Sequence, residues 1–588
     1  MTLSGILQRI ELPRGSRFIN DDVRPVGTER RTWTFLTFHN FSPLNGRLIG
    51  GTNVGLLINC NIATYLTGSA LIPLGLTWWQ AIIAIILGNI LATAALILAS
   101  LAGAYYHIGF PVFSRAVWGI WGSQFVIWNR IFLSLGKQLL FPPPVETSLT
   151  PSVWYGFQSW VGGQCVYLML LSWDPSFEQH VPNTIPASTG MTSAQFLSYF
   201  IFCVVTLPFL WIRPHRIQNF FYVASSITLV FFLVLLIWAL ATMGDDGFGD
   251  TISDSTPLPT TGGPQSTTWL MISGIMSTIG GIAAGILNQN DYARLARKPG
   301  DAIWGQTFAF PLYSVVASVI GILVTAATQK RMGEPIWNPP TLFAAMLAKD
   351  PTAGTRAAVF FAGLALSISQ MGSNLPGNAL AGGIDLASVF PKYINIRRGA
   401  YLMALLSPVV NPWRLVNTAT IFLTVLSGYS VFLAPMTGLM VAHYNLVAKA
   451  KVNVDDLFVG KKESIYWYTM GINWRAFVAW TVGVAPTMPG FIAAVNPSVQ
   501  ISNGAINLYQ LNYLFGFVVS AFVYYALHRF VPDERFNAFI KGGDTAKDMQ
   551  QLYEERWDMT YTDTDGEPGS ESHSIQRNKG PGSVATSV

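Results

Sequence analysis

Residues 372–378 read Gly-Ser-Asn-Leu-Pro-Gly-Asn and interrupt an apolar stretch centred near Leu366. A proline and two glycines disfavour a regular helix there, and two asparagines place polar amides in apolar surroundings. Asn59-Cys-Asn61 interrupts the first long apolar stretch, and the sixth contains three glycines within Gly280–Gly285. Such interruptions in two halves of a chain indicate discontinuous membrane helices and inverted repeats that line a site. For any single glycine, close helix packing is the alternative.

The composition indicates a polytopic membrane protein. Only 11% of the 588 residues are charged and 51% are hydrophobic, and a mean hydropathy of +0.39 is too high for a set of soluble domains. A membrane span needs about 20 apolar residues, and about twelve such stretches lie between residues 50 and 530. The net charge of +5 is small and the basic residues lack interleaved aromatics, so the sequence does not favour nucleic-acid binding.

Charge alternates along the loops and predicts the orientation of the chain. Basic segments such as Arg294–Lys298 and Lys449–Lys462 alternate with poorly basic ones such as Gly244–Asp250. Because basic loops stay in the cytoplasm, we expect both chain ends to be cytoplasmic and the number of spans to be even. No cleavable signal peptide is evident, so the first span is expected to direct insertion. The three cysteines lack metal-ligand spacing, and no metal or organic cofactor is expected.

The third apolar stretch is cut by Gly136–Ser152, which contains three consecutive prolines. Proline cannot continue a helix, and irregular backbone facing lipid is not tolerated at membrane depth. Joining Leu135 directly to Val153 restores one continuous helix. The segment begins with Gly-Lys-Gln, which a splice-donor sequence can encode, and contains Ser-Leu-Thr, which a branch-point sequence can encode. We hypothesise that residues 136–152 are a retained in-frame intron, with a genuine loop insertion as the alternative. Sequencing the transcript distinguishes the two.

Two polar pairs within apolar sequence form the candidate site. Trp154 and Gln158 are spaced i,i+4, as are Asn374 and Asn378, so on a helix each pair shares one face. Polar groups inside a membrane are costly unless they are bonded. A flat molecule that stacks on the indole and hydrogen-bonds the amides satisfies both pairs. Structural packing is the alternative, because the chain has 19 tryptophans and asparagines also link membrane helices.

Eleven further segments, spread from about Asn20 to about Phe530, carry a resemblance to a known family. They are Asn20-Asp-Asp-Val-Arg-Pro25, Arg31-Thr-Trp33, Leu76-Thr-Trp-Trp-Gln80, His107-Ile-Gly-Phe-Pro-Val112, Trp118-Gly-Ile-Trp-Gly122, Val153-Trp-Tyr-Gly156, Gly162-Gly-Gln-Cys165, Asn290-Asp-Tyr-Ala-Arg294, Phe390–Gly399, Ser427–Pro435 and Gly471–Phe477. Together they resemble the nucleobase-cation-symport-1 family, and within it the fungal uracil, allantoin and uridine permease branch. Each segment is weak alone, but they follow the family's order.

The resemblance implies an all-α polytopic membrane protein with a LeuT-like fold, in which two inverted five-helix repeats and two extra helices make about twelve transmembrane helices. It also implies cation-coupled import of a nucleobase-like compound across the fungal plasma membrane. The expected parts are a cytoplasmic N-terminal tail at 1–48, repeats at 49–245 and 246–442, a cytoplasmic loop at 443–471, two C-terminal helices at 472–530 and a disordered cytoplasmic tail at 531–588.

The family's substrate-binding residues correspond to the two polar pairs. Trp154 matches the aromatic that stacks on the substrate ring, and Gln158 matches the amide that bonds its edge. Asn374 and Asn378 match the asparagines that relatives use for substrate in the eighth span. Asn61, in the first interrupted span, is expected to contribute to the same site.

Two departures from the family pattern affect the expected site. Bacterial relatives stack a tryptophan on the second face of the ring, where this chain has Ile282, so the sandwich is incomplete or a first-span aromatic such as Tyr65 substitutes. Sodium-coupled relatives carry two adjacent hydroxyl residues in the eighth span, where this chain has Gly372-Ser373. Losing an oxygen ligand weakens a sodium site, so a proton is the expected coupling ion. Ser369 and Ser373 are candidate remnants of a cation site.

Two acidic residues are candidates for gating. Asp385 lies seven residues after Asn378, on the same helix face, and is a candidate gate or proton relay. A surface charge at a helix end is the alternative. Asp291 follows the sixth span and is expected to pair with Arg294 or a neighbouring loop, and the family match gives it an inner-gate role.

Three classes of function compete. The first is a secondary transporter for a pyrimidine, allantoin or a nucleoside, with thiamine or another vitamin as the alternative cargo. The second is a membrane-embedded enzyme, which the dispersed positions of the seven histidines disfavour. The third is a nutrient receptor that binds without transport. Besides the lipid bilayer and the small-molecule cargo, ubiquitination and endocytic machinery are candidate partners of tail lysines, although an inert tail is the alternative.

Overall fold

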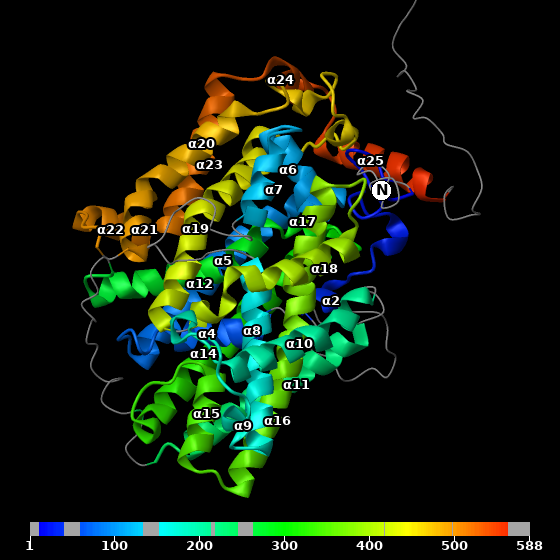
Figure 1. Ribbon diagram of the computed structural model, residues 1–588. Coiled ribbons are helices and arrows are strands. Elements are labelled where there is room, and N and C mark those ends of the chain that lie inside the picture. Colours follow the sequence, from blue (N-terminus) through cyan, green and yellow to red (C-terminus); the bar gives the residue numbers. More distant parts are fainter. Residues whose placement is uncertain are drawn as a thin grey trace, which may run out of the picture.

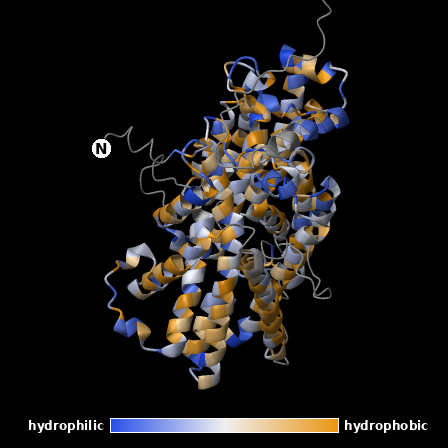
Figure 2. Ribbon diagram, turned by 90° about the vertical axis from the view of Figure 1, so that its right-hand side faces the viewer, coloured by the Kyte–Doolittle hydropathy of each residue, from blue (hydrophilic) through white to orange (hydrophobic). Residues whose placement is uncertain are grey.

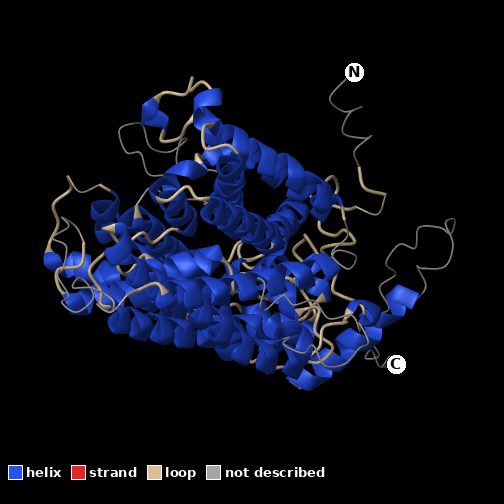
Figure 3. Cartoon of the chain, turned by 90° about the horizontal axis from the view of Figure 1, so that it is seen from below, coloured by secondary structure: helices blue, strands red, loops and turns tan. Residues whose placement is uncertain are grey.

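The computed structural model is a bundle of helices (Figure 1). It describes residues 11–39, 59–132, 152–212, 218–244, 248 and 263–562, except positions 14, 417 and 497. Within these ranges the chain forms helices, loops and two isolated β-bridges, as Figure 3 shows from below. Residues 136–151 of the suspected intron lie outside the described residues. Helix α7 ends at Phe132 before the segment, and α8 begins at Ser152, its last residue.

The helices of the first half of the chain are η1 (Thr28–Arg30), α2 (Phe35–His39), α4 (Ile62–Ser69), α5 (Trp78–Tyr106), α6 (Phe110–Trp118), α7 (Ser123–Phe132), α8 (Ser152–Trp173), α9 (Phe177–His180), η3 (Ala187–Thr189), α10 (Ser193–Trp211), α11 (Gln218–Ala241), α12 (Thr267–Leu287) and α13 (Asn290–Ala293).

The helices of the second half are α14 (Pro299–Met332), α15 (Pro339–Lys349), α16 (Ala353–Asn374), η5 (Leu375–Leu380), α17 (Ala381–Val389), α18 (Ile396–Leu406), η6 (Ser407–Val410), η7 (Pro412–Val416), α19 (Ala419–Ala442), η8 (His443–Val447), η9 (Asp455–Phe458), η10 (Ile465–Trp467), α20 (Trp474–Val484), η11 (Ala485–Thr487), α21 (Met488–Val495), α22 (Asn503–Gln510), α23 (Asn512–Phe530), α24 (Glu534–Lys541) and α25 (Ala546–Thr562).

Within the described ranges, nine helical segments are long and apolar enough to cross a membrane. They are Trp78–Tyr106, Ser193–Trp211, Phe220–Ala241, Thr267–Leu287, Pro299–Met332, Ala353–Val389, Ala419–Val447, Trp474–Val495 and Asn512–Phe530. Apolar residues cover most of the long helices in Figure 2. The chain is therefore a multi-pass membrane protein, as expected, while the count of twelve spans stays a prediction.

The sixth span is continuous, so the break expected at its glycines is wrong. Helix α12 runs unbroken through Gly280, because its backbone hydrogen bonds stay within the helix. A Cβ at Gly280 would lie only 2.3 Å from the carbonyl oxygen of Leu426 on α19. This glycine therefore serves close packing of α12 on α19, which was the alternative explanation.

The first and eighth spans have the irregular geometry that their sequences predict. Helix α4 begins at Ile62, and the Asn61 side chain caps it by accepting a hydrogen bond from the backbone N–H of Thr64 at 3.1 Å. In the eighth span, the π-helical turn η5 separates α16 from α17 and contains Pro376. A π turn leaves carbonyls without their usual i+4 partners, and the Tyr292 hydroxyl donates to the Pro376 carbonyl oxygen at 3.2 Å.

The described terminal segments pack on the bundle, and Glu534–Lys541 and Ala546–Thr562 form helices within the region expected from the sequence to be a disordered tail. Helix α24 buries Phe536, and α25 buries Tyr553 against His107. On the N-terminal side, Arg31 lies 3.9 Å from the carboxylate of Glu554 on α25, and the two segments lie side by side in Figure 1. The buried aromatic residue on each helix explains why α24 and α25 pack on the bundle, because packing removes its apolar surface from water.

Candidate functional site

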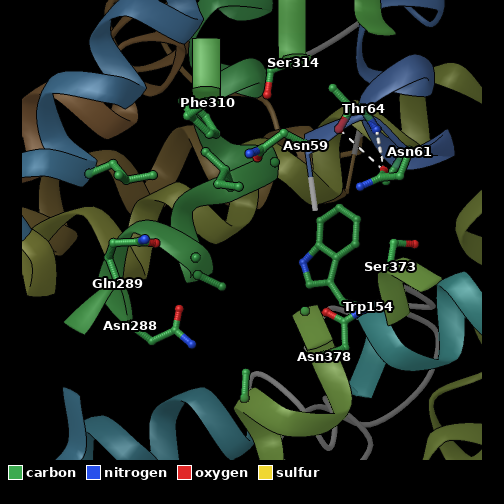
Figure 4. Close-up of a pocket in the computed structure, with 18 of the residues that line it drawn as sticks. Asn59, Asn61, Thr64, Trp154, Asn288, Gln289, Phe310, Ser314, Ser373 and Asn378 are labelled. Atoms are coloured by element: carbon green, nitrogen blue, oxygen red, sulfur yellow. Dashed lines mark hydrogen bonds between the residues drawn. The ribbon is translucent and has the colours of Figure 1, made fainter. Parts of the chain in front are cut away.

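A cavity of about 190 Å³ lies among α4, α8, α12, α14 and the α16–η5–α17 segment (Figure 4). Six of the nine site residues predicted from the sequence line it: Asn61, Trp154, Gln158, Ser373, Asn378 and Asp385. The other three, Ser369, Asn374 and Asp291, lie outside it. The cavity therefore brings together side chains from three segments that are far apart in the sequence.

Trp154 places its indole in the centre of the cavity, beside Asn378 and Ser373 in Figure 4. Its ring makes T-shaped contacts with Phe157 at 5.5 Å and with Tyr429 at 6.4 Å between ring centroids. These neighbours hold the indole without stacking on it. A flat ring in the cavity has access to an aromatic surface at this position.

Hydrogen bonds between neighbouring side chains orient the two cavity amides. The Ser373 hydroxyl has three acceptors within reach: Gln158 Oε1 at 3.2 Å and the carbonyl oxygens of Ser369 and Gln370 at 3.1 and 3.4 Å. When it donates to Gln158, the NH₂ group is the part of Gln158 left for a ligand. Asn378 Nδ2 donates to Asn374 Oδ1 at 2.9 Å, so Asn378 offers its carbonyl oxygen. One amide thus presents a donor and the other an acceptor.

Asn374 is completely buried between α16 and α8 and does not touch the cavity. Its Nδ2 donates to the Tyr155 carbonyl oxygen at 3.1 Å and to Ser159 Oγ at 3.0 Å. Its oxygen accepts the hydrogen bond from Asn378. Asn374 thus fixes the position of Asn378, which lines the cavity, relative to α8. Ser369, one turn earlier on α16, is also buried, and its hydroxyl has no hydrogen-bond partner among the described residues.

Asp385 is not a surface charge. It lines the cavity and forms an ion pair with Arg130 of α7, with Nη2 and Oδ2 3.3 Å apart and both side chains 5% exposed. The Arg130 guanidinium also lies 4.8 Å from the ring centroid of Phe110. Sequence reasoning missed Arg130, although a cation inside an apolar stretch is itself a signal of function.

Asp291 lies outside the cavity, at the junction of α13 with the start of α6. Its Oδ1 accepts a hydrogen bond from the backbone N–H of Phe110 at 2.9 Å. Arg294 donates to the backbone carbonyl of Asp291 at 3.2 Å. Burial raises the pKa of the Asp291 carboxyl above its ordinary value, and the charges of Arg294 and Arg130 oppose that shift. This carboxylate thus links the end of the sixth span to α6.

The second face of the cavity differs from the expectation. Ile282 lines the cavity, but Tyr65 does not; the Tyr65 ring is fully buried against Phe232, 5.6 Å away. The suggestion that Tyr65 replaces the missing tryptophan is therefore wrong, because its side chain packs between helices. Phe310 of α14 is an aromatic residue that does line the cavity. Sequence reasoning missed it, because one phenylalanine among the many apolar residues of this span carries no signal of its own.

The helical bundle and its central polar cavity are those of a membrane transport protein. Residues 51–138 and 140–516 match the family described as "Permease for cytosine/purines, uracil, thiamine, allantoin". The chain belongs to this permease family, which confirms the family prediction. Because the family consists of permeases, the enzyme hypothesis is set aside.

Individual relatives show how far the similarity extends. The allantoin permease of Saccharomyces cerevisiae is 34% identical over 518 residues, which cover 87% of this chain and 76% of the relative. The uracil permease of the same yeast is 32% identical over 520 residues, with the same coverage of 87% and 76%. The transporter aclS of Aspergillus oryzae is 33% identical over 555 residues, covering 88% of this chain and 87% of the relative.

The fold is shared with a solved transporter. Mhp1, described as a nucleobase-cation-symport-1 family transporter in a closed conformation with bromovinylhydantoin bound, superposes with a TM-score of 0.66 at 19% identity. The superposition covers 91% of this chain and 99% of Mhp1. The predicted transporter fold is thereby confirmed.

Proposed function

We propose that this permease imports a nucleobase or a related compound of the uracil, allantoin or uridine class, by proton symport and alternating access, and that Trp154, Gln158, Asn378 and Asn61 bind the cargo. The observation that carries the proposal is the cavity in which one indole lies beside two oriented amides. The printed names of the relatives support the same class of cargo.

The orientation of the amides indicates which edge of the cargo they bind. Gln158 donates from its NH₂ group to a cargo carbonyl, and Asn378 accepts from a cargo N–H through its oxygen. A neighbouring carbonyl and N–H occur in uracil, uridine and allantoin. Stacking on Trp154 adds about 1–3 kcal/mol for a flat ring. An analogue that lacks one of the edge groups leaves a buried amide unpaired and is rejected.

Asp385 is the proposed site of proton coupling. It is a buried carboxylate on the cavity wall, and its charge is balanced by Arg130 at 3.3 Å. Protonation of Asp385 would cancel that ion pair and free Arg130 and α17 to rearrange, which couples a proton to a change of conformation. Gly372 stands beside Ser373 where sodium-coupled relatives have a second hydroxyl residue, and the loss of that oxygen ligand supports a proton over sodium. Asp291 is proposed to act at the inner gate.

The proposed setting is the plasma membrane, with both chain ends in the cytoplasm. The alternation of basic and poorly basic loops supports this orientation. The contact between Arg31 and Glu554 agrees with it, because it requires both terminal segments to be on one side of the membrane.

Uptake in cells that lack their own nucleobase permeases tests the proposal. Labelled uracil, uridine and allantoin are offered at acidic and neutral external pH, in buffers with and without sodium, and thiamine, cytosine and unlabelled cargo compete. We expect saturable uptake that rises at acidic pH and does not need sodium. Trp154→Ala and Asn378→Ala should reduce uptake to background while the protein still reaches the cell surface. Binding without uptake would indicate a receptor, and unchanged uptake by either variant would refute its assignment.

A further inference from the structure

Gln306 of α14 is a buried amide that the central site does not use. It lines the cavity with 5% of its surface exposed. Neither its Nε2 nor its Oε1 has a hydrogen-bond partner among the described residues. Buried amides in folded proteins are nearly always hydrogen-bonded, and leaving both ends unpaired is unfavourable. A group that enters the cavity is therefore expected to pair with Gln306.

Gln306 lies far along α14 from the level of Asn61. Further along α14, the Ser318 hydroxyl donates to the carbonyl oxygen of Thr64 at 2.9 Å, which places Ser318 beside the first turn of α4 and close to Asn61. Gln306 precedes Ser318 by twelve residues, which is about 18 Å along a helix axis. A single pyrimidine ring cannot span that distance. A ligand on Gln306 therefore occupies a second position in the cavity.

The surroundings of Gln306 repeat the chemistry of the central site. The neighbouring residue, Gly305, packs so tightly on α2 that an added Cβ would lie 2.5 Å from Phe38 Cβ. Phe38 contacts Trp33 at 5.3 Å between ring centroids, and Trp33 stacks on Tyr292 at 6.5 Å. All three aromatic side chains line the cavity. This end of the cavity thus combines aromatic rings with an unpaired carboxamide.

The same end faces the basic loops. The Trp33 backbone N–H donates to the Leu295 carbonyl oxygen at 3.0 Å, and the Arg297 N–H donates to the Trp33 carbonyl oxygen at 2.8 Å. Residues 31–39 are thereby attached to the basic segment between α13 and α14. In the proposed orientation this segment is cytoplasmic, so Gln306 lies between the central site and the cytoplasm.

We propose that Gln306, Trp33 and Tyr292 form a second, inner binding site, at which the cargo pauses between the Trp154 site and the cytoplasm. The inner site rests on the proposed function, because it takes the same flat cargo with carbonyl and N–H groups. The amide of Gln306 bonds that cargo through both of its ends, and the aromatic rings contact its faces. Occupation of the inner site lets the cargo leave the central site before it reaches water.

Equilibrium binding to the full-length protein in lipid nanodiscs tests the inner site. The probe is whichever of labelled uracil, uridine or allantoin shows saturable uptake. We expect the wild type to bind in two components, of which the weaker has a Kd at least tenfold higher. Trp154→Ala should keep only the weaker component, Gln306→Met should keep only the tighter one, and the double variant should keep neither. Gln306→Met should also lower the maximal uptake rate about tenfold without changing the apparent KM.

Gln329→Met is the matched control, because it makes the same substitution on α14 at a residue that does not line the cavity. It should bind in two components like the wild type. A Trp154→Ala protein with no residual saturable binding overturns the inner site, and this result does not depend on the folding of Gln306→Met. If adding Gln306→Met does not change the residual binding of the Trp154→Ala protein, the inner site is also overturned. Water is then the partner of the Gln306 amide. If the wild type neither binds nor transports any of the three probes, the proposed function itself fails.

Discussion

The ion pair between Arg130 and Asp385 gives a prediction whose size follows from the structure. Its atoms are 3.3 Å apart and both side chains are 5% exposed. At an effective dielectric constant of about 20, two unit charges at this distance attract by about 5 kcal/mol. Removing one partner of a buried pair typically costs about 3–5 kcal/mol, because the other charge is left uncompensated. Asp385→Asn and Arg130→Gln should each lower the free energy of unfolding by about that amount.

The double variant separates the ion pair from other effects of each substitution. Arg130→Gln/Asp385→Asn leaves no charge of this pair uncompensated, so it should lose less stability than the two single losses combined. The free energy of unfolding can be measured by titrating purified protein in mixed micelles with a denaturing detergent. Losses that add to within about 0.5 kcal/mol would show that the two side chains do not interact, and the reasoning would be refuted. In cells, the double variant should reach the surface yet lose the acid dependence of uptake.

Three further predictions concern the cavity and its walls. Trp154→Phe should retain uptake with a KM raised no more than about tenfold, since a smaller ring still stacks; loss of all uptake at normal surface abundance would contradict this. Gly280→Ala should sharply reduce the yield of folded protein because its Cβ would lie 2.3 Å from the Leu426 carbonyl oxygen, whereas Gly281→Ala, with no contact under 3.6 Å, should be purified normally. Asn374→Ala should cost about 1–3 kcal/mol of stability without changing the order of competitors in uptake; an altered order would give Asn374 a direct contact with cargo.

The sequence predicted those parts of the fold and site that depend on local chemistry. Composition and apolar length gave the multi-pass bundle, and the i,i+4 spacing placed Trp154 and Gln158 on one face of α8. The proline and glycines of the eighth span predicted an irregular turn, and η5 has one. In each case the property belongs to a few neighbouring residues, so a single sequence contains it.

The remainder depends on which helices become neighbours. Asn374 and Asn378 are both asparagines and are spaced i,i+4, so the sequence predicts the same role for both. Only Asn378 reaches the cavity, because α8 covers Asn374. The glycines of the sixth span were misread because a glycine that breaks a helix and one that admits a neighbour look alike in sequence. A functional role for Arg130 and Gln306 follows only from the structure, in which α7 and α14 line the same cavity as Asp385. A single sequence does not state these pairings.

The π turn η5 sets the angular phase of the eighth membrane segment. A π turn contains one residue more than an α turn, and each residue of an α-helix advances the direction of its side chain by about 100°. Because the π turn takes up this extra residue, converting Leu375–Leu380 to a regular α-helix without deleting a residue would rotate α17 by about that angle and carry Asp385 away from Arg130. The extra residue of the π turn therefore sets the rotation at which both the Asp385 carboxylate and the Asn378 amide face the same cavity.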